Sequence, residues 1–339
     1  MVATQNQPNR NLGLDFTKGA LVLIMVLYHW INYFLVGVDN RYLRFLTPSF
    51  IFITGFIVSN VYLSKYGASD PKLPKRLVER GLKILAVFAL LNLSRYFLIS
   101  RSETGQFPSS PITLDGLFDM YVMGSGLGGG ESKLLAFSIL IPIGYLLLLS
   151  ALILLFARVY AYSFHVICAI SLLGVVALGF QGITSPNLEL ISIGLLGVIA
   201  GSFPLQKIDA AVRHPYLLGF CYFLYLAAIT YWNILFPLQI VGVLLSLAII
   251  YLVGQGRGRR GVVKRCIDLL GKYSLFGYIA QIAILQVLRR AANHLPSVEL
   301  ALALSFLLAF VLTIASVEIV DRMRAGSIVI DKAYKAVFA

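Results

Sequence analysis

The sequence predicts an all-α membrane protein, a bundle of about ten transmembrane helices around a central polar cavity. Of its 339 residues, 59% are hydrophobic and only 13% are charged, and the mean hydropathy is +0.85. Such a composition lies outside the range of soluble domains. Apolar runs of about 20 residues, the length that crosses a bilayer, recur along the whole chain. The sequence shows no soluble domain and no internal repeat.

Three regions follow from the positions of these runs. We expect a cytoplasmic N-terminal segment over residues 1–17, a transmembrane bundle over 18–320 and a charged cytoplasmic tail over 321–339. The expected spans cover residues 18–38, 43–64, 82–99, 134–157, 164–181, 188–204, 215–232, 236–254, 273–290 and 299–320. The longest polar connection, residues 100–132, separates the third span from the fourth and is expected to lie outside the cell.

The basic residues set the expected orientation. A net charge of +13 would suggest nucleic-acid binding in a soluble protein. Here most of the 28 lysines and arginines fall in segments on the same side as the termini. The positive-inside rule therefore predicts a multipass protein of the plasma (inner) membrane with both termini in the cytoplasm. Its surroundings are membrane lipid, and no nucleic-acid partner is expected.

The chain has no pattern typical of a metal site. Its three cysteines and four histidines are scattered without ligand spacing, so we expect no metal and no bound cofactor. Nothing in the sequence indicates an oligomeric state.

One histidine lies inside the first expected span. Apolar residues fill nearly every position from Ala20 to Leu27, and His29 follows. A helix rises about 1.5 Å per residue, so Lys18 and His29 are separated by roughly 16 Å along the axis. If Lys18 lies at the water boundary, the imidazole lies near the middle of the bilayer. An ionisable residue at that depth is typical of a functional site facing the bundle interior, and the alternative is a structural histidine bonded to a neighbouring helix.

The polar residues of this span share one face. Asp15, Lys18, His29 and Asn32 fall on one stripe at 3.6 residues per turn. Asp15 lies about four turns from His29, too far for a direct bond on one straight helix. We therefore expect Asp15 to pair with Lys18, with Arg10 or with a cation of the third span.

A basic stripe precedes the third span. Arg76, Arg80 and Lys83 are spaced at i, i+4 and i+7, which places them on one helical face. Positive-inside topology explains part of this pattern. A phosphate clamp is a compatible interpretation, because arginine presents a planar fork and lysine a point charge to phosphate oxygens.

Taken together, these motifs resemble the acyltransferase-3 family of multipass membrane acyltransferases. That family opens with a pattern close to R-x-x-x-L-D-x-x-R-G, followed by an apolar run ending in histidine. The matching residues are Arg10, Leu14, Asp15, Lys18, Gly19 and His29. FIFITGF at 50–56 resembles the family's F-F-x-x-S-G-F, RGLKIL at 80–85 is similar to R-x-x-R, and LGKYSLFGYIAQ at 270–281 resembles L-G-x-x-S-Y-x-x-Y-L-x-H.

The chain departs from the family pattern at three positions. Lys18 and Lys83 replace arginines, which weakens the case for bidentate phosphate binding. Gln281 stands where many members carry a second histidine. These differences point to a divergent branch, nearer the glucan succinyltransferases or the heparan-type glucosaminide acetyltransferases, and a non-catalytic homologue is an alternative.

The resemblance implies transfer of an acetyl or succinyl group from cytoplasmic acyl-CoA, the co-substrate, to a hydroxyl of an extracytoplasmic glycan or lipid-linked sugar. His29 and Asp15 are the expected catalytic residues, with His29 either a general base or a nucleophile that carries the acyl group. The residues expected to bind acyl-CoA are Arg10, Lys18, Arg76, Arg80 and Lys83. Those expected to line the cavity are Asn32, Thr54, Ser274, Tyr278 and Gln281.

Two other classes of function remain open at this stage. A transporter or flippase for a lipid-linked sugar or an acyl compound would carry the same polar stripe and do no chemistry. A structural subunit of an envelope assembly is the third possibility. Release of free CoA thiol separates an enzyme from a transporter.

Overall fold

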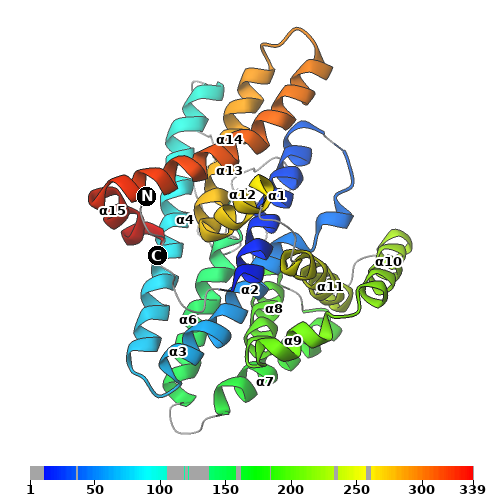
Figure 1. Cartoon of the computed structure of the whole chain (residues 1–339), viewed down its shortest axis with the longest axis vertical. Helices are drawn as coiled ribbons and strands as arrows, with labels where there is room; N and C mark the ends of the chain where they lie inside the picture. Colours follow the sequence, from blue (N-terminus) through cyan, green and yellow to red (C-terminus); the bar gives the residue numbers. More distant parts are fainter. Residues whose placement is uncertain are drawn as a thin grey trace. The chain divides into compact units, whose positions relative to one another are not determined.

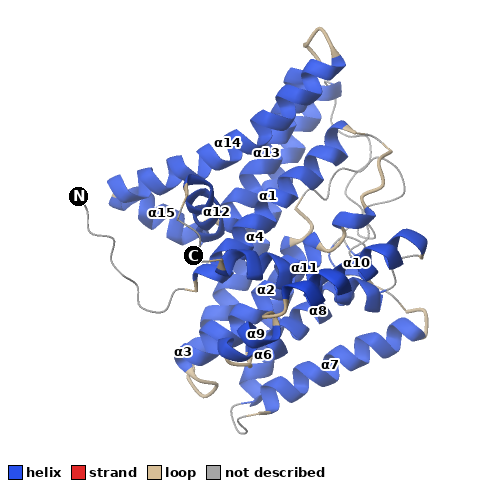
Figure 2. Ribbon diagram, turned by 45° about the vertical axis from the view of Figure 1, so that its right-hand side comes forward, coloured by secondary structure: helices blue, strands red, loops and turns tan. Residues whose placement is uncertain are grey.

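The computed structural model describes residues 11–35, 37–104, 118, 121, 137–157, 162–183, 185–232, 236–256 and 261–338. Within these ranges the regular elements are all helices, as Figure 2 shows, and the all-α membrane prediction is confirmed. The chain divides into two compact units. Unit 1 comprises residues 1–46, 211–233 and 241–328, and unit 2 comprises residues 47–210, 234–240 and 329–339.

Unit 1 is organised around the first helix. Its elements are α1 (Leu12–Phe34), η1 (Arg41–Leu43), α10 (Pro215–Tyr231), most of α11 (Phe236–Gln255), α12 (Val262–Lys272), α13 (Ser274–Ala292) and α14 (Val298–Gly326) (Figure 1). The side chain of Asn11 caps α1 by accepting a hydrogen bond from the backbone N–H of Leu14 at 3.2 Å. From that start, α1 packs against α12, α13 and α14.

Two glycines let α1 and α12 touch backbone to backbone. A Cβ atom at Gly19 would lie 1.8 Å from the carbonyl oxygen of Ile267, and one at Gly271 would lie 1.8 Å from the carbonyl oxygen of Asp15. Both distances are far inside van der Waals contact, so no other residue fits without moving a helix. Gly19 and Gly271 both belong to the motifs quoted above, which explains in part why those motifs carry glycine.

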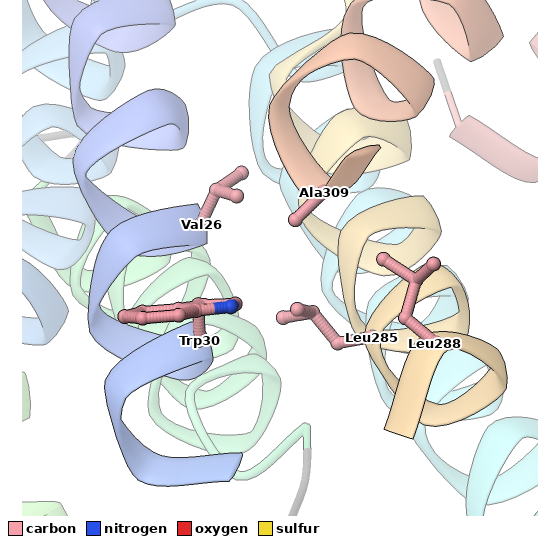
Figure 3. Close-up of a cluster of buried hydrophobic side chains, with 5 residues drawn as sticks. All are labelled: Val26, Trp30, Leu285, Leu288 and Ala309. Carbon is pink, nitrogen blue, oxygen red and sulfur yellow. The ribbon is translucent and has the colours of Figure 1, made fainter. Parts of the chain in front are cut away.

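An apolar cluster joins the other end of α1 to α13 and α14. In Figure 3, Val26 and Trp30 of α1 point toward Leu285 and Leu288 of α13 and Ala309 of α14. The indole N–H of Trp30 donates a hydrogen bond to Ser305 Oγ at 3.0 Å. The cluster therefore buries a large aromatic side chain without leaving its polar atom unpaired.

Unit 2 holds the remaining helices. They are α2 (Leu46–Ile57), the π-helix η2 (Val58–Leu63), α3 (Ser64–Tyr66), α4 (Lys72–Thr104), α6 (Leu140–Phe156), α7 (Ser163–Phe180), α8 (Pro186–Gly201), α9 (Leu205–Ala211) and α15 (Ile328–Phe338). Close glycine packing recurs where α2 meets α8. A Cβ atom at Gly55 would lie 1.9 Å from the Gly194 carbonyl oxygen, and one at Gly197 would lie 2.1 Å from that of Phe52.

Several helices are long and apolar enough to cross a membrane. In the described part of the chain there are five, Gly13–Phe34, Arg41–Tyr66, Ser163–Phe180, Phe236–Gln255 and Val298–Gly326. A sixth is added if α8 and α9, which are bent by 106°, form one broken span. The apolar helices α6 and α10 are shorter, at 17 residues each. The predicted total of ten spans is therefore not confirmed, although α4 and α13 are helical where the third and ninth spans were expected.

Candidate active site

Asp15 and Lys18 form an ion pair near the start of α1. Lys18 Nζ lies 2.7 Å from Asp15 Oδ1, and the Asp15 side chain is buried. Of the partners expected for Asp15, the structure shows Lys18, whereas Arg10 lies outside the described residues. Because the Asp15 backbone also abuts Gly271, the pair lies where α1 crosses α12.

His29 lies further along α1, about 21 Å from Asp15. Its Nε2 atom is buried and has no hydrogen-bond partner among the described residues. The Tyr28 ring stands edge-on to the imidazole with 5.3 Å between ring centroids, and the Tyr278 ring of α13 lies 6.2 Å away. The imidazole therefore lies beside α13, and its buried Nε2 atom is able to form a hydrogen bond with water or a substrate.

Gln281 lies on α13, three residues beyond Tyr278. It is fully buried, and neither its Nε2 nor its Oε1 atom has a hydrogen-bond partner in the described part of the chain. A buried polar group without a partner costs about 1–3 kcal/mol. Helices α1 and α13 pack together, so His29 and Gln281 place three unsatisfied polar atoms on two adjoining helices. Water or a polar substrate would satisfy them.

We expect Gln281→Leu to leave the protein equally stable or up to about 2 kcal/mol more stable, because it removes two buried atoms that no described group satisfies. The same substitution should lower the acyl transfer that the sequence motifs lead us to expect, because the substrate then loses the amide as a hydrogen-bond partner. Chemical denaturation and turnover of the purified variant measure the two effects separately. Loss of stability together with unchanged turnover would show a purely structural glutamine.

Two further residues expected to line the cavity also lie in unit 1. Ser274 is the first residue of α13 and is half-buried. Asn32 is exposed near the end of α1, where its Oδ1 accepts a hydrogen bond from Asn40 Nδ2. The structure thus places Tyr278 beside His29, while the Asn32 side chain is bonded to the connection that follows α1.

Thr54 lies in unit 2, on α2. Its hydroxyl donates to the backbone carbonyl of Phe50 at 2.9 Å, one turn earlier in the same helix. This back-bonding satisfies the hydroxyl proton locally. The neighbouring Gly55 makes the close contact with α8, so this motif contributes to helix packing in unit 2.

The two arginines of the basic stripe of α4 contact tyrosines of the preceding helices, η2 and α3. Nη1 of Arg80 donates to the Tyr62 hydroxyl, and Nη1 of Arg76 donates to the Tyr66 hydroxyl. The guanidinium carbons lie 5.9 and 4.9 Å from the respective ring centroids, within cation–π range. Between the tyrosines and the arginines the chain turns at Gly67, whose φ is +74°. We call these two pairs the arginine–tyrosine rungs.

The rungs hold the arginines in place without using all their donors. A guanidinium has five N–H groups, and each tyrosine hydroxyl takes one. Lys83, the third residue of the stripe, is half-buried one turn beyond Arg80. The two tyrosines were missed in the sequence, although Tyr62 and Tyr66 repeat the i, i+4 spacing of the arginines.

A second group that the sequence did not reveal ties the start of α13 to α14. Asp321 Oδ1 accepts hydrogen bonds from the Tyr273 hydroxyl and from Lys272 Nζ, both at 2.6 Å. The guanidinium of Arg324 lies over the Tyr273 ring, 5.2 Å from its centroid. These contacts fix the beginning of the helix that carries Tyr278 and Gln281.

A family model described as an acyltransferase domain matches residues 11–319, which is most of the chain. The protein therefore belongs to the acyltransferase-3 family, a class of multipass membrane acyltransferases. No curated protein and no solved structure matches it.

Proposed function

We propose that the protein is an integral membrane O-acyltransferase of the plasma (inner) membrane, with both termini in the cytoplasm. It moves an acetyl or succinyl-type group from cytoplasmic acyl-CoA to a hydroxyl of an extracytoplasmic glycan or lipid-linked sugar. The observation that carries the proposal is the buried Nε2 atom of His29, which has no hydrogen-bond partner among the described residues. Family membership supports the transfer of acyl groups in general.

The proposed reaction uses His29 as the general base. Its Nε2 atom takes the proton of the acceptor hydroxyl while that oxygen attacks the thioester carbonyl carbon. The carbon–sulfur bond breaks, a carbon–oxygen ester bond forms, and the proton passes from the imidazolium to the CoA thiolate. Gln281 Nε2–H donates to the carbonyl oxygen as negative charge develops there. In the alternative route, His29 Nε2 attacks the thioester carbonyl first, and the carbon–sulfur bond breaks to release the CoA thiolate. The acceptor hydroxyl then displaces the imidazole from the acyl carbon, and its proton passes to the thiolate.

The ion pair of α1 and the basic stripe of α4 have separate proposed roles. Asp15 holds Lys18 at the start of the helix that carries His29, and Lys18 with Arg10 binds the donor. Arg76, Arg80 and Lys83 bind the phosphates of CoA. The arginine–tyrosine rungs support this role, because they orient two guanidinium groups that keep N–H donors for phosphate oxygens.

We expect the double variant Arg80→Gln/Lys83→Gln to bind acyl-CoA at least about 100-fold more weakly, since each of the two charge-assisted contacts to phosphate contributes about 1.5–3 kcal/mol. Isothermal titration with acetyl-CoA measures the affinity. Lys332→Gln is the matched control for the loss of positive charge, because Lys332 is exposed on α15. Wild-type affinity in the double variant would remove both residues from the donor site.

Thiol release distinguishes the enzyme from a transporter. Purified protein in vesicles receives acetyl-CoA on the side of its termini and a lipid-linked sugar in the bilayer. An acyltransferase releases free CoA thiol only when the acceptor is present. Movement of the sugar lipid across the bilayer without thiol release would support the transporter and contradict the proposed reaction.

A further inference from the structure

A cavity of about 370 Å³ lies within unit 2, and none of the candidate active-site residues lines it. It is formed by the end of α7, the start of α8 and the first turn of α11. Its walls are mainly apolar, and its lining includes Val176, Phe180, Leu188, Glu189, Phe236 and Gln239. The cavity therefore combines an apolar surface with one carboxylate and one amide.

Glu189 stands out among the acidic residues of the described chain. Asp15, Glu318, Asp321 and Asp331 each have a lysine or arginine within 4 Å. The half-buried Glu189 side chain has no ion pair and no hydrogen bond to any described residue. A carboxylate in apolar surroundings is unfavourable unless O–H or N–H donors satisfy it. A ligand with such donors would complete the site.

The cavity and the arginine–tyrosine rungs lie near opposite ends of α8. At the far end of this helix, the carbonyl oxygen of Gly201 accepts a hydrogen bond from Asn60 Nδ2 at 3.3 Å, and the chain continues through η2 to Tyr62 of the rungs. The length of α8 between Glu189 and Gly201 is about 18 Å. One end of unit 2 thus carries arginines that suit phosphates. The other end carries a half-buried carboxylate without an ion pair to any described residue, which would repel them.

The cavity also adjoins an exposed apolar surface of α7, a helix that is long and apolar enough to cross a membrane. Only 11% of the apolar span in α7 is buried, and Phe180, which lines the cavity, is 81% exposed. An apolar chain that lies along α7 could therefore enter the cavity from the bilayer. A ligand that satisfies both the walls and Glu189 has an apolar tail and a head rich in hydrogen-bond donors.

We propose that this cavity binds the acyl acceptor, and that the acceptor is a glycolipid. Sugar hydroxyls donate to the Glu189 carboxylate and bond the Gln239 amide, while the lipid chain lies against Val176, Phe180 and Leu188. The inference rests on the proposed function, because an acyl acceptor must present a hydroxyl. In the proposed topology this end of α8 faces the outside of the cell, where the acceptor is expected.

Photo-crosslinking tests the site without requiring turnover. The protein is placed in phosphatidylglycerol nanodiscs with monoglucosyl diacylglycerol that carries a benzophenone on one acyl chain. We expect the benzophenone to label residues within 175–189 and 236–239. Unlabelled monoglucosyl diacylglycerol should compete with this labelling, whereas diacylglycerol should not. Glu189→Gln should reduce labelling about tenfold, as expected for loss of hydrogen bonds to a charged acceptor. Glu299→Gln, at an exposed glutamate in α14, should label as the wild type does.

Labelling outside these segments, or equal labelling of Glu189→Gln and wild type, would overturn the proposal. So would equal competition by phosphatidylethanolamine, which would show an amine site instead. The wild-type competition experiment remains decisive even if Glu189→Gln folds poorly. Thiol release without labelling of the cavity would contradict this site alone, whereas labelling without thiol release would contradict the proposed function alone.

Discussion

Replacement of His29 by alanine is expected to lower acyl transfer by about 10²- to 10⁴-fold, the usual contribution of a positioned acid–base group. The structural reason is that Nε2 of His29 is buried and unpartnered in the described chain, so it is available to the hydroxyl proton. The side chain makes no hydrogen bond to any described residue, so alanine removes only its ring contacts with Tyr28 and Tyr278, and we expect the helices to stay packed. Release of CoA thiol by the purified variant measures the loss.

His294→Ala is the matched control, because His294 is exposed beyond the end of α13. This variant should release CoA thiol at the wild-type rate. Acetyl-CoA binding and the elution profile of His29→Ala should also match the wild type, which separates a catalytic defect from a misfolded sample. Unchanged turnover in a well-folded His29→Ala variant would exclude His29 both as base and as acyl carrier.

Gly271→Ala is expected to destabilise the protein by about 3 kcal/mol or more, at the upper end of overpacking effects. Its new Cβ atom would lie 1.8 Å from the Asp15 carbonyl oxygen, a backbone atom that cannot move without shifting α1 against α12. In an open helical position the same substitution stabilises by up to about 1 kcal/mol. A decrease in stability would therefore indicate the backbone contact between α1 and α12, and an increase would indicate an open position. Denaturant titration in detergent measures it.

Gly219→Ala in α10 provides the control for this experiment. Apart from the neighbouring backbone of its own helix, no atom of the described residues lies within 4 Å of a Cβ built at Gly219, so this variant should be equally or more stable than the wild type. If both variants gained stability, the backbone contact between α1 and α12 would not exist in solution. A loss confined to Gly271→Ala would locate that contact beside the Asp15–Lys18 pair.

Local patterns in the sequence were sufficient to predict the helices and an ion pair formed within one helix. The apolar runs predicted an all-helical membrane protein, because backbone groups in lipid must be satisfied inside each segment. The i, i+3 spacing of Asp15 and Lys18 anticipated their ion pair. The predicted count of ten spans exceeds the number of described helices that are long and apolar enough to cross a membrane. One reason is that α13 carries the polar residues Gln281, Arg289 and Arg290 within its apolar run.

Contacts between distant segments could not be predicted in the same way. The bond from Tyr273 to Asp321 joins residues 48 positions apart, and neither residue follows a period that points to the other. The cavity beside Glu189 is formed by three helices, and only their packing shows that this carboxylate has no partner in the described chain. The motif glycines were matched by pattern, but the close backbone approach that requires them appears only in three dimensions.

The most direct test of the proposed reaction follows the acyl group itself. Purified wild-type protein in vesicles receives acetyl-CoA labelled with ¹³C in the acetyl group, and the glycolipid acceptor is analysed by mass spectrometry. We expect the acceptor to gain one labelled acetyl group for each CoA thiol released, and we expect neither product with His29→Ala. An acceptor of unchanged mass, in vesicles whose protein binds acetyl-CoA, would contradict the proposed reaction.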